Sequence, residues 1–431
     1  MTQKFITPND PNIICETDSA SIQKAVNYAV RKGVNKVLIP KLNKRTGKGG
    51  WTIDKSILLP SNITVILDNC HMTLADGAFC NFFRNELCGT VIANTLDGEQ
   101  HDIHIIGQGY AILDGGNTNW FLECNRNVDN CKTENMGLKI NNAILLHNVR
   151  DFSIENIEIR NQRWWAINLI YCRNGKVIDF TCMATNIIQN QDGLDIRCGC
   201  NNITVERLTG KSGDDLIALT ALERSENGFH VSGKDSNIHD IFIKDVLGCS
   251  IINGLVVLRN QDSRQIYNVE MENVIQSDLE DLNNHPYTIV DVGQNDYIYK
   301  KQSPIGSTRN IKAKTIIGDS SAPVMVGATL EDCKFENIHS FGGRYAFVST
   351  GVKMKDVKVD GVFVYDKPAH LPLRFERVPY TGNDIEFSVY ERDEDYLENV
   401  TFDNVVCENR KLNISIKENY KNGFRLEGKK L

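Results

Sequence analysis

The sequence of 431 residues predicts an all-β fold, a single right-handed parallel β-helix (a solenoid) with one capping helix near its N-terminus. Ten segments share a pattern in which a polar turn precedes alternating apolar and polar residues, as is typical of strands with one buried face. Segments near residues 152, 177 and 203 follow one another at intervals of about 25 residues, a period that indicates stacked coils.

A coil of this length closes once around a β-helix with three short strands and three turns. Asn and Asp at the turns suit left-handed backbone conformations. Hairpin signals such as Asn-Gly are sparse, which favours the solenoid over an antiparallel β-sandwich. The ten segments are residues 101–109, 150–161, 174–182, 201–210, 236–246, 264–274, 309–318, 330–340, 352–362 and 397–406. Because each coil of a solenoid packs on its neighbours, we expect residues 1–431 to form one domain.

The two ends of the solenoid need covers, because they expose unpaired strand edges. A helix is predicted over residues 19–31, within a cap region of about residues 16–33, because its apolar residues recur at helical spacing. Asp18 or Ser19 can cap its start. At the other end, residues 410–431 predict a short terminal strand and a basic, solvated tail.

Composition excludes several classes of protein. The formal net charge of −7 gives no support to nucleic-acid binding, which asks for a basic surface. No run of about 18 apolar residues predicts a membrane span, and the first residues lack the apolar core of a secretory signal. The 13 cysteines, an odd number without zinc-like pairs, fit reduced thiols. We therefore expect a cytoplasmic protein without a metal or other cofactor.

Two acidic elements are the strongest candidates for catalysis. Residues 190–196 read NQDGLDI, residues 212–219 read SGDDLIAL, and Asp214 follows Asp192 by 22 positions, close to one coil. Carboxylates on neighbouring coils push at least one pKa upward, so one group can act as an acid while another acts as a base. Asp214 and Asp215 would face opposite sides of a regular strand, so a bend is needed there. A solvated Asp-rich turn is the structural alternative.

These motifs resemble those of the polygalacturonase-type enzymes known as glycoside hydrolase family 28. The matching residues are Asn190, Asp192, Gly193 and Asp195, followed one coil later by Asp214 and Asp215. The resemblance extends over about residues 16–275. It implies that Asp214 is the general acid, that Asp192 and Asp215 activate water, and that the anomeric configuration is inverted.

Two departures from the family pattern concern the substrate. Asn253 stands where the family has a histidine, and the stretch HPYTIVDVG (285–293) offers no match to its Arg-x-Lys motif. A uronate therefore lacks its usual cationic partners. Arg197, Arg259 or Arg264 could replace them, or could be solvated surface residues.

Further candidates for substrate binding come from the same region. Trp164 and Trp165 stand where the family has an aromatic residue near the cleft, and each could stack on a sugar or lie in the core. His230 lies in an apparent insertion, residues 221–240, that could form a wall of the binding site. The candidate substrate-binding residues are Asn190, Asn253, Trp164, Trp165, Arg197, Arg259 and His230.

The sequence thus predicts a glycoside hydrolase acting on an oligosaccharide, pectin-related or from another plant or microbial glycan. One alternative is another β-helix carbohydrate enzyme, a polysaccharide lyase or a fructan-processing transferase or hydrolase. A lyase would need a Lys or Arg base, for which the acidic motifs offer no constellation. Another alternative is a non-catalytic carbohydrate-binding β-helix, which would not require two aspartate elements in register.

Overall fold

The computed structural model divides the chain into two compact units, which are described separately. Unit 1 comprises residues 1–214 and 226–235, and unit 2 comprises residues 215–225 and 236–431. The single domain expected from the sequence stays a prediction. The structure describes residues 5–78, 80–117, 142–184, 190–221, 229–260, 264–277, 287–293, 304–342, 345–349, 353–365, 371–375, 397–407 and 410–416.

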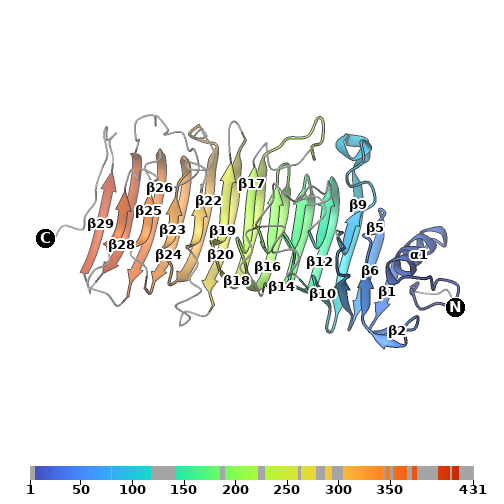
Figure 1. The fold of residues 1–431 in the computed structure, drawn as a ribbon. Coiled ribbons are helices and arrows are strands. Elements are labelled where there is room, and N and C mark those ends of the chain that lie inside the picture. Colours follow the sequence, from blue (N-terminus) through green and yellow to red (C-terminus); the bar gives the residue numbers. More distant parts are fainter. Residues whose placement is uncertain are drawn as a thin grey trace. The chain divides into compact units, whose positions relative to one another are not determined.

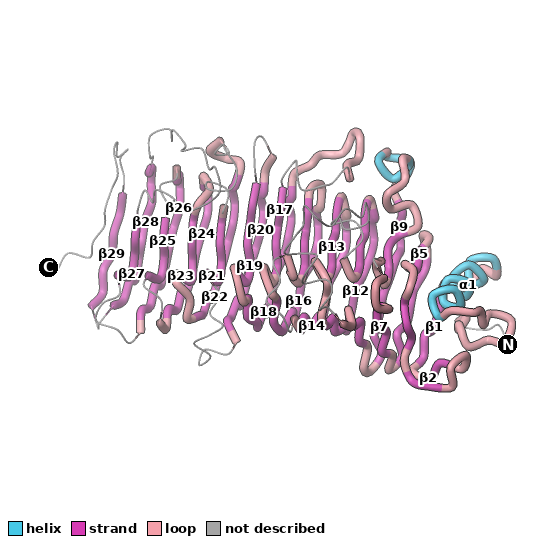
Figure 2. The backbone as a smooth tube through the Cα atoms, viewed as in Figure 1, coloured by secondary structure: helices cyan, strands magenta, loops and turns pink. Residues whose placement is uncertain are grey.

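Parallel strands in two sheets build unit 1 (Figures 1 and 2). Its long-strand sheet contains, in spatial order, β1 (Lys36–Pro40), β6 (Ile63–Asp68), β9 (Gln100–Gln108), β12 (Val149–Arg160), β14 (Arg173–Met183) and β16 (Asn201–Ser212). Beside this path lie β4 (Trp51–Ile53), β7 (His71–Leu74) and β10 (Ile112–Asp114). Its short-strand sheet contains β5 (Ile57–Leu59), β8 (Phe83–Asn85), β11 (Ile144–His147), β13 (Ile167–Ile170) and β15 (Leu194–Arg197). Smaller elements are the hairpin β2 (Leu42–Asn43) and β3 (Lys48–Gly49) and the 3-10 turns η1 (Ile92–Asn94) and η2 (Leu96–Gly98).

Unit 2 repeats the same two-sheet plan. Its long-strand sheet contains β18 (Ile238–Ser250), β20 (Ile266–Gln276), β22 (Thr308–Gly318), β24 (Leu330–Ser340), β26 (Met354–Val364), β28 (Leu397–Cys407) and β29 (Arg410–Ile416). Its short-strand sheet contains β17 (Ile217–Ala221), β19 (Gly254–Asn260), β21 (Thr288–Val292), β23 (Ala322–Val326), β25 (Tyr345–Ser349) and β27 (Leu371–Phe375). The predicted right-handed parallel β-helix is confirmed, since β–crossover–β connections of this kind are right-handed.

Equivalent residues of successive coils stand opposite one another, so apolar side chains form columns along the core. In unit 2, Ile241 of β18 stands opposite Val269 of β20, which stands opposite Ile311 of β22. All three side chains are buried. Burying each such aliphatic side chain stabilises the fold by roughly 1.5–3 kcal/mol. The period-two alternation in the sequence therefore marks the core face of the long strands.

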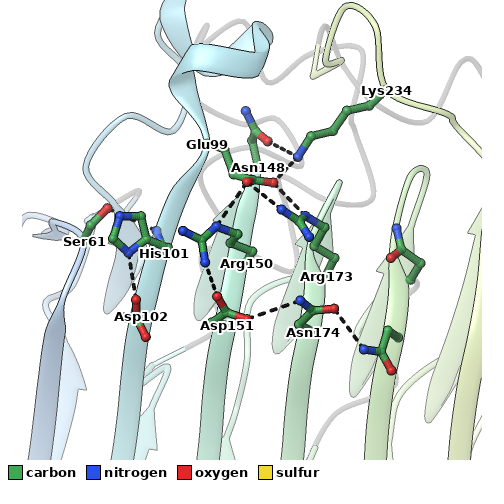
Figure 3. Close-up of polar contacts among 12 residues, drawn as sticks. Ser61, Glu99, His101, Asp102, Asn148, Arg150, Asp151, Arg173, Asn174 and Lys234 are labelled. Atoms are coloured by element: carbon green, nitrogen blue, oxygen red, sulfur yellow. Dashed lines mark hydrogen bonds and ion pairs between the residues drawn. The ribbon is translucent and has the colours of Figure 1, made fainter.

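Asn and Asp occupy left-handed positions at the turns, as the sequence predicts. In unit 1, Asp151, Asn174 and Asn202 have φ angles of 55°, 55° and 52°. Asn174 Nδ2 donates a hydrogen bond to Asp151 Oδ1 at 3.3 Å (Figure 3). Asn202 Nδ2 donates one to Asn174 Oδ1 at 2.9 Å. The side chains that permit the turn also connect one coil to the next.

The predicted capping helix is present as α1 (Asp18–Arg31), but its N-cap is neither Asp18 nor Ser19. Thr17 is the N-cap, and its hydroxyl accepts a hydrogen bond from the Ala20 amide at 3.2 Å. The Asp18 carboxylate instead accepts hydrogen bonds from other segments, including one at 2.7 Å from Asn43 Nδ2. No helix in the described ranges is long and apolar enough to cross a membrane.

At the C-terminal end, the predicted terminal strand is present as β29. It pairs antiparallel with β28, whereas the strands it follows in unit 2 are parallel. The predicted tail, residues 417–431, lies outside the described residues.

Candidate active site

Asp192 lies in the turn that leads into β15 of unit 1. The turn begins with Asn190, whose φ of 62° is left-handed. The Asp192 carbonyl accepts a hydrogen bond from the Ala166 amide at 2.9 Å, and the Gly193 carbonyl accepts one from the Ile167 amide at 3.0 Å. The main chain on both sides of the Asp192 side chain is therefore held by the preceding coil. The residue is buried, with 4% of its surface exposed.

Asp214 lies in the next turn of the same unit, at the end of β16. The chain bends at Gly213 and Asp214, where the sequence calls for a bend. The Gly213 amide donates to the Gln191 carbonyl at 2.9 Å, and the Asn190 amide donates to Asp214 Oδ2 at 2.9 Å. The two acidic turns therefore lie on neighbouring coils, as their 22-residue offset predicts. Asn190 contributes a main-chain contact to the Asp214 carboxylate.

Asp215 follows directly in the chain and belongs to unit 2. The Asp215 side chain is buried, with 1% of its surface exposed, and Arg259 Nη2 lies 2.7 Å from its Oδ2. Arg259 lies on β19, opposite Thr220 of β17, and its side chain is 15% exposed. The solvated position that the sequence allowed for Arg259 is therefore wrong. Removing either partner of this ion pair would leave the other as a buried charge.

Arg197 is also buried, so its solvated alternative is wrong as well. It lies on β15 two residues after Asp195, and its Nη1 is 3.7 Å from Asp195 Oδ1. Its guanidinium carbon lies 4.3 Å from the centre of the Trp165 ring, in cation–π contact. Trp165 is buried, and Trp164 is half-buried. Of the two tryptophans, Trp165 therefore packs against an arginine within the protein.

The structure also describes three other candidates from the sequence. Asn253 of unit 2 is half-buried, its amide donates to Ser250 Oγ at 3.0 Å, and its carbonyl accepts from the Tyr287 amide at 2.7 Å. Arg264 of unit 2 is half-buried, and His230 of unit 1 is exposed. The roles of these residues in substrate binding stay predictions.

The segment after the acidic pair is anchored on unit 1, which the sequence did not reveal. Lys234 Nζ binds the Glu99 carboxylate and donates to Asn148 Oδ1 at 2.7 Å (Figure 3). The ring of Phe229 meets His147 edge-on, with centroids 4.8 Å apart. Of the predicted insertion 221–240, residues 222–228 lie outside the described ranges, and β18 already begins at residue 238.

Glu99 is the centre of this anchor. Arg173 Nε and Nη2 donate to its two oxygens at 2.9 Å each, and Arg150 Nε lies 3.3 Å from Oε2. Burial by itself would raise the pKa of the Glu99 carboxyl, but the hydrogen bonds from Arg173 and Lys234 outweigh it and lower the pKa to about 2. The Glu99 carboxyl group at the centre of the anchor is therefore ionised at neutral pH.

The coils of both units define the class of the protein, a right-handed parallel β-helix. The model of the Glycosyl hydrolases family 28 matches residues 56–227, a segment that contains Asp192, Asp214 and Asp215. The predicted resemblance to polygalacturonase-like enzymes of this family is confirmed, over a shorter segment than residues 16–275.

Solved structures share the fold at low sequence identity. An exopolygalacturonase from Thermotoga maritima has a TM-score of 0.61 and 12% identity, over 98% of this chain and 96% of that chain. The surface adhesin PfbA of Streptococcus pneumoniae has a TM-score of 0.54 and 12% identity, over 96% and 100%. The A-module of the Azotobacter vinelandii mannuronan C-5 epimerase AlgE6 has a TM-score of 0.51 and 12% identity, over 85% and 91%. Among curated proteins, none matches by sequence. These likenesses establish the fold and leave the activity to be argued from the site.

Proposed function

We propose that the chain is a glycoside hydrolase that cleaves O-glycosidic bonds of a pectin-related or other plant or microbial oligosaccharide. The observation that carries the proposal is the direct bonding between two acidic turns on neighbouring coils, within the segment that matches glycoside hydrolase family 28. Most glycoside hydrolases need two carboxyl groups, one on each side of the glycosidic bond that they hydrolyse.

In this proposal each aspartate has its own role. Asp214 protonates the leaving oxygen, and the contact from the Asn190 amide to its Oδ2 fixes the orientation of the carboxyl group. Asp192 and Asp215 activate the attacking water, which reaches the anomeric carbon from the opposite face. The product would then have the inverted anomeric configuration, as expected where acid and base carboxyls are about 6.5–9.5 Å apart.

A glycan-binding protein without activity is the second candidate. The observation that favours it is the burial of Asp215 in its ion pair with Arg259, since a buried carboxylate already bound to an arginine is less available to a water molecule. The two candidates differ in whether any sugar is released.

The test measures product release from aryl glycosides and from pectic and fructan oligosaccharides. We expect Asp192→Asn and Asp214→Asn to lower turnover by about 10²–10⁴-fold, the range for a lost acid or base, with unchanged unfolding curves. Asp97→Asn, at an exposed position, is the matched control and keeps full activity. Binding of oligosaccharide without turnover by the native protein would instead establish the second candidate.

Asp215 needs a separate comparison, because Asp215→Asn also leaves Arg259 without its charged partner. The double variant Asp215→Asn/Arg259→Met removes both charges, so turnover lost in the folded double variant does not arise from an unpaired buried charge. Proton NMR in the first minutes of the reaction identifies the anomer that forms first. Retention would indicate a nucleophilic carboxylate and overturn the inverting mechanism.

A further inference from the structure

We propose that a buried pair of amide side chains, Gln162 and Gln191, positions the two acidic turns relative to each other. This inference rests on the proposed function and assigns to the same site two positioning residues that the sequence motifs do not include. Both side chains are buried, with 1% and 0% of their surface exposed. Both belong to unit 1, as do Asp192 and Asp214.

The pair connects the Asp192 turn to the preceding coil. Gln191 Nε2 donates to the main-chain carbonyl of Gln162 at 2.7 Å. Gln162 Nε2 lies 3.0 Å from Cys182 Sγ and also reaches back to the carbonyls of Asp192 and Gln191, at 3.3 and 3.4 Å. Each amide therefore binds the main chain next to the other, and the two contacts together set the position of the turn that carries Asp192.

The same residue connects that turn to the following coil. The main-chain carbonyl of Gln191 accepts from the Gly213 amide at 2.9 Å and lies 3.4 Å from the Asp214 amide. The Gln191 side chain thus holds one neighbouring coil while its carbonyl holds the other. A displacement of Gln191 would change the position of Asp192 and Asp214 at once.

The pair is not what stability alone would favour. The Oε1 atoms of Gln162 and Gln191 are buried without a hydrogen-bond partner in the described part of the chain. Turning the Gln191 amide over would place its oxygen against the carbonyl oxygen of Gln162, so this neighbour fixes its orientation. Buried carbonyls without partners cost stability, and an apolar side chain of similar length would avoid that cost. Acid–base catalysis, by contrast, depends on placement, since a displacement of about 1 Å can cost about 10²-fold in rate.

The experiment replaces each amide by an apolar side chain of similar length in the full-length protein. We expect Gln162→Met and Gln191→Met to lower kcat by about 10- to 100-fold while KM stays within about twofold, because the loss concerns the transition state. Gln276→Met is the matched control. Gln276 is a buried glutamine of unit 2 whose Oε1 accepts from the Asp319 amide at 2.7 Å, so its substitution should change stability without changing kcat.

A second variant separates positioning from general packing. Gln162→Glu keeps the shape of the side chain, and only its protonated form can donate to the carbonyl of Asp192. Its kcat relative to the native protein should therefore rise as the pH is lowered. Hydrogen exchange adds a measurement that needs no substrate. In Gln191→Met, the amides of Asn190 and Gly213 should exchange about tenfold faster or more at unchanged Tm.

The outcomes distinguish this inference from the proposed function. Native kcat in Gln162→Met and Gln191→Met, together with loss of turnover in Asp192→Asn and Asp214→Asn, overturns the positioning role alone. Native turnover in both aspartate variants overturns the proposed function. Unchanged exchange at Asn190 and Gly213 overturns the positioning role whether or not a substrate has been found.

Discussion

Replacing Glu99 by Gln should weaken the anchor of the segment that returns to unit 1 at Lys234, and the effect should depend on pH. The Glu99 side chain is 16% exposed and is surrounded by Arg150, Arg173 and Lys234 (Figure 3). Its folded-state pKa of about 2 lies roughly two units below the value of about 4.3 for an unfolded glutamate. Two units correspond to about 3 kcal/mol before discounting, and solvent screening of this partly exposed cluster reduces the contribution to roughly 1–2 kcal/mol.

The sign of the pH dependence follows from the lowered pKa. The contribution of Glu99 is fully present above pH of about 5 and is lost as the pH falls toward the folded-state value of about 2. Thermal unfolding at low salt should therefore show a Tm for Glu99→Gln that is about 1–2 °C below that of the native protein at pH 7. The difference should shrink steadily below pH of about 4.

A control for this prediction uses the exposed pair of Arg207 and Asp179. Both side chains are 47% exposed, so Asp179→Asn should leave the Tm nearly unchanged. A Tm difference for Glu99→Gln that stays constant from pH 7 to 2.5, or that widens as the pH falls, would refute the reasoning from the charged anchor.

Two further predictions concern local structure in unit 1. Thr17→Ala should cost about 1 kcal/mol in the free energy of unfolding, because the hydroxyl caps α1, and Thr17→Ser should keep most of the native value. Equal free energies of unfolding for Thr17→Ala and Thr17→Ser would contradict a stabilising role of the Thr17 hydroxyl as the helix cap. Gly199→Ala should cost roughly 1–3 kcal/mol, because Gly199 has a φ of 73° and a Cβ there would lie 2.1 Å from the Tyr171 ring. Gly33→Ala, with a φ of 67° and nothing within 4 Å of the Cβ, should cost less, and urea unfolding compares the two.

The long strands could be predicted from the sequence because their chemistry is local. Residues 330–340 were expected as a strand and form β24 (Leu330–Ser340), and residues 264–274 correspond to β20 (Ile266–Gln276). Alternating burial and left-handed Asn or Asp recur in each of these coils. The short strands gave no such signal. All five residues of β23 (Ala322–Val326) are buried, so no period of two appears in their sequence.

The polar contacts of the candidate site could not be predicted from the sequence, for a different reason. Coil lengths vary, so residues that meet across coils have no fixed separation. Arg259 and Asp215 lie on either side of residues 222–237, which belong to no described strand, and their ion pair could not be counted from a repeat. Gln191 is not among the residues that match the family motif, although its side chain and its carbonyl bind different coils. A side-chain amide directly before a candidate acid is a signal that could have pointed to it.

The last prediction is that a neutral glycoside is a better substrate than the corresponding galacturonide. Asp192, Asp214 and Asp215 make the proposed site acidic, and two of the candidate arginines are engaged within the protein. Arg259 is paired with Asp215 at 2.7 Å, and Arg197 lies over Trp165 and 3.7 Å from Asp195.

A uronate would therefore have to take an arginine from a buried contact or be desolvated without a cationic partner. Either course costs several kcal/mol, at about 1.4 kcal/mol per tenfold change in affinity. We expect kcat/KM for a galactoside to exceed that for the matching galacturonide by about tenfold or more. Arg259→Met provides a further comparison, because it should leave this ratio unchanged if Arg259 serves Asp215 and not the substrate. A clear preference of the native protein for the galacturonide, lost in Arg259→Met, would falsify this charge argument and make Arg259 the partner of the substrate carboxylate.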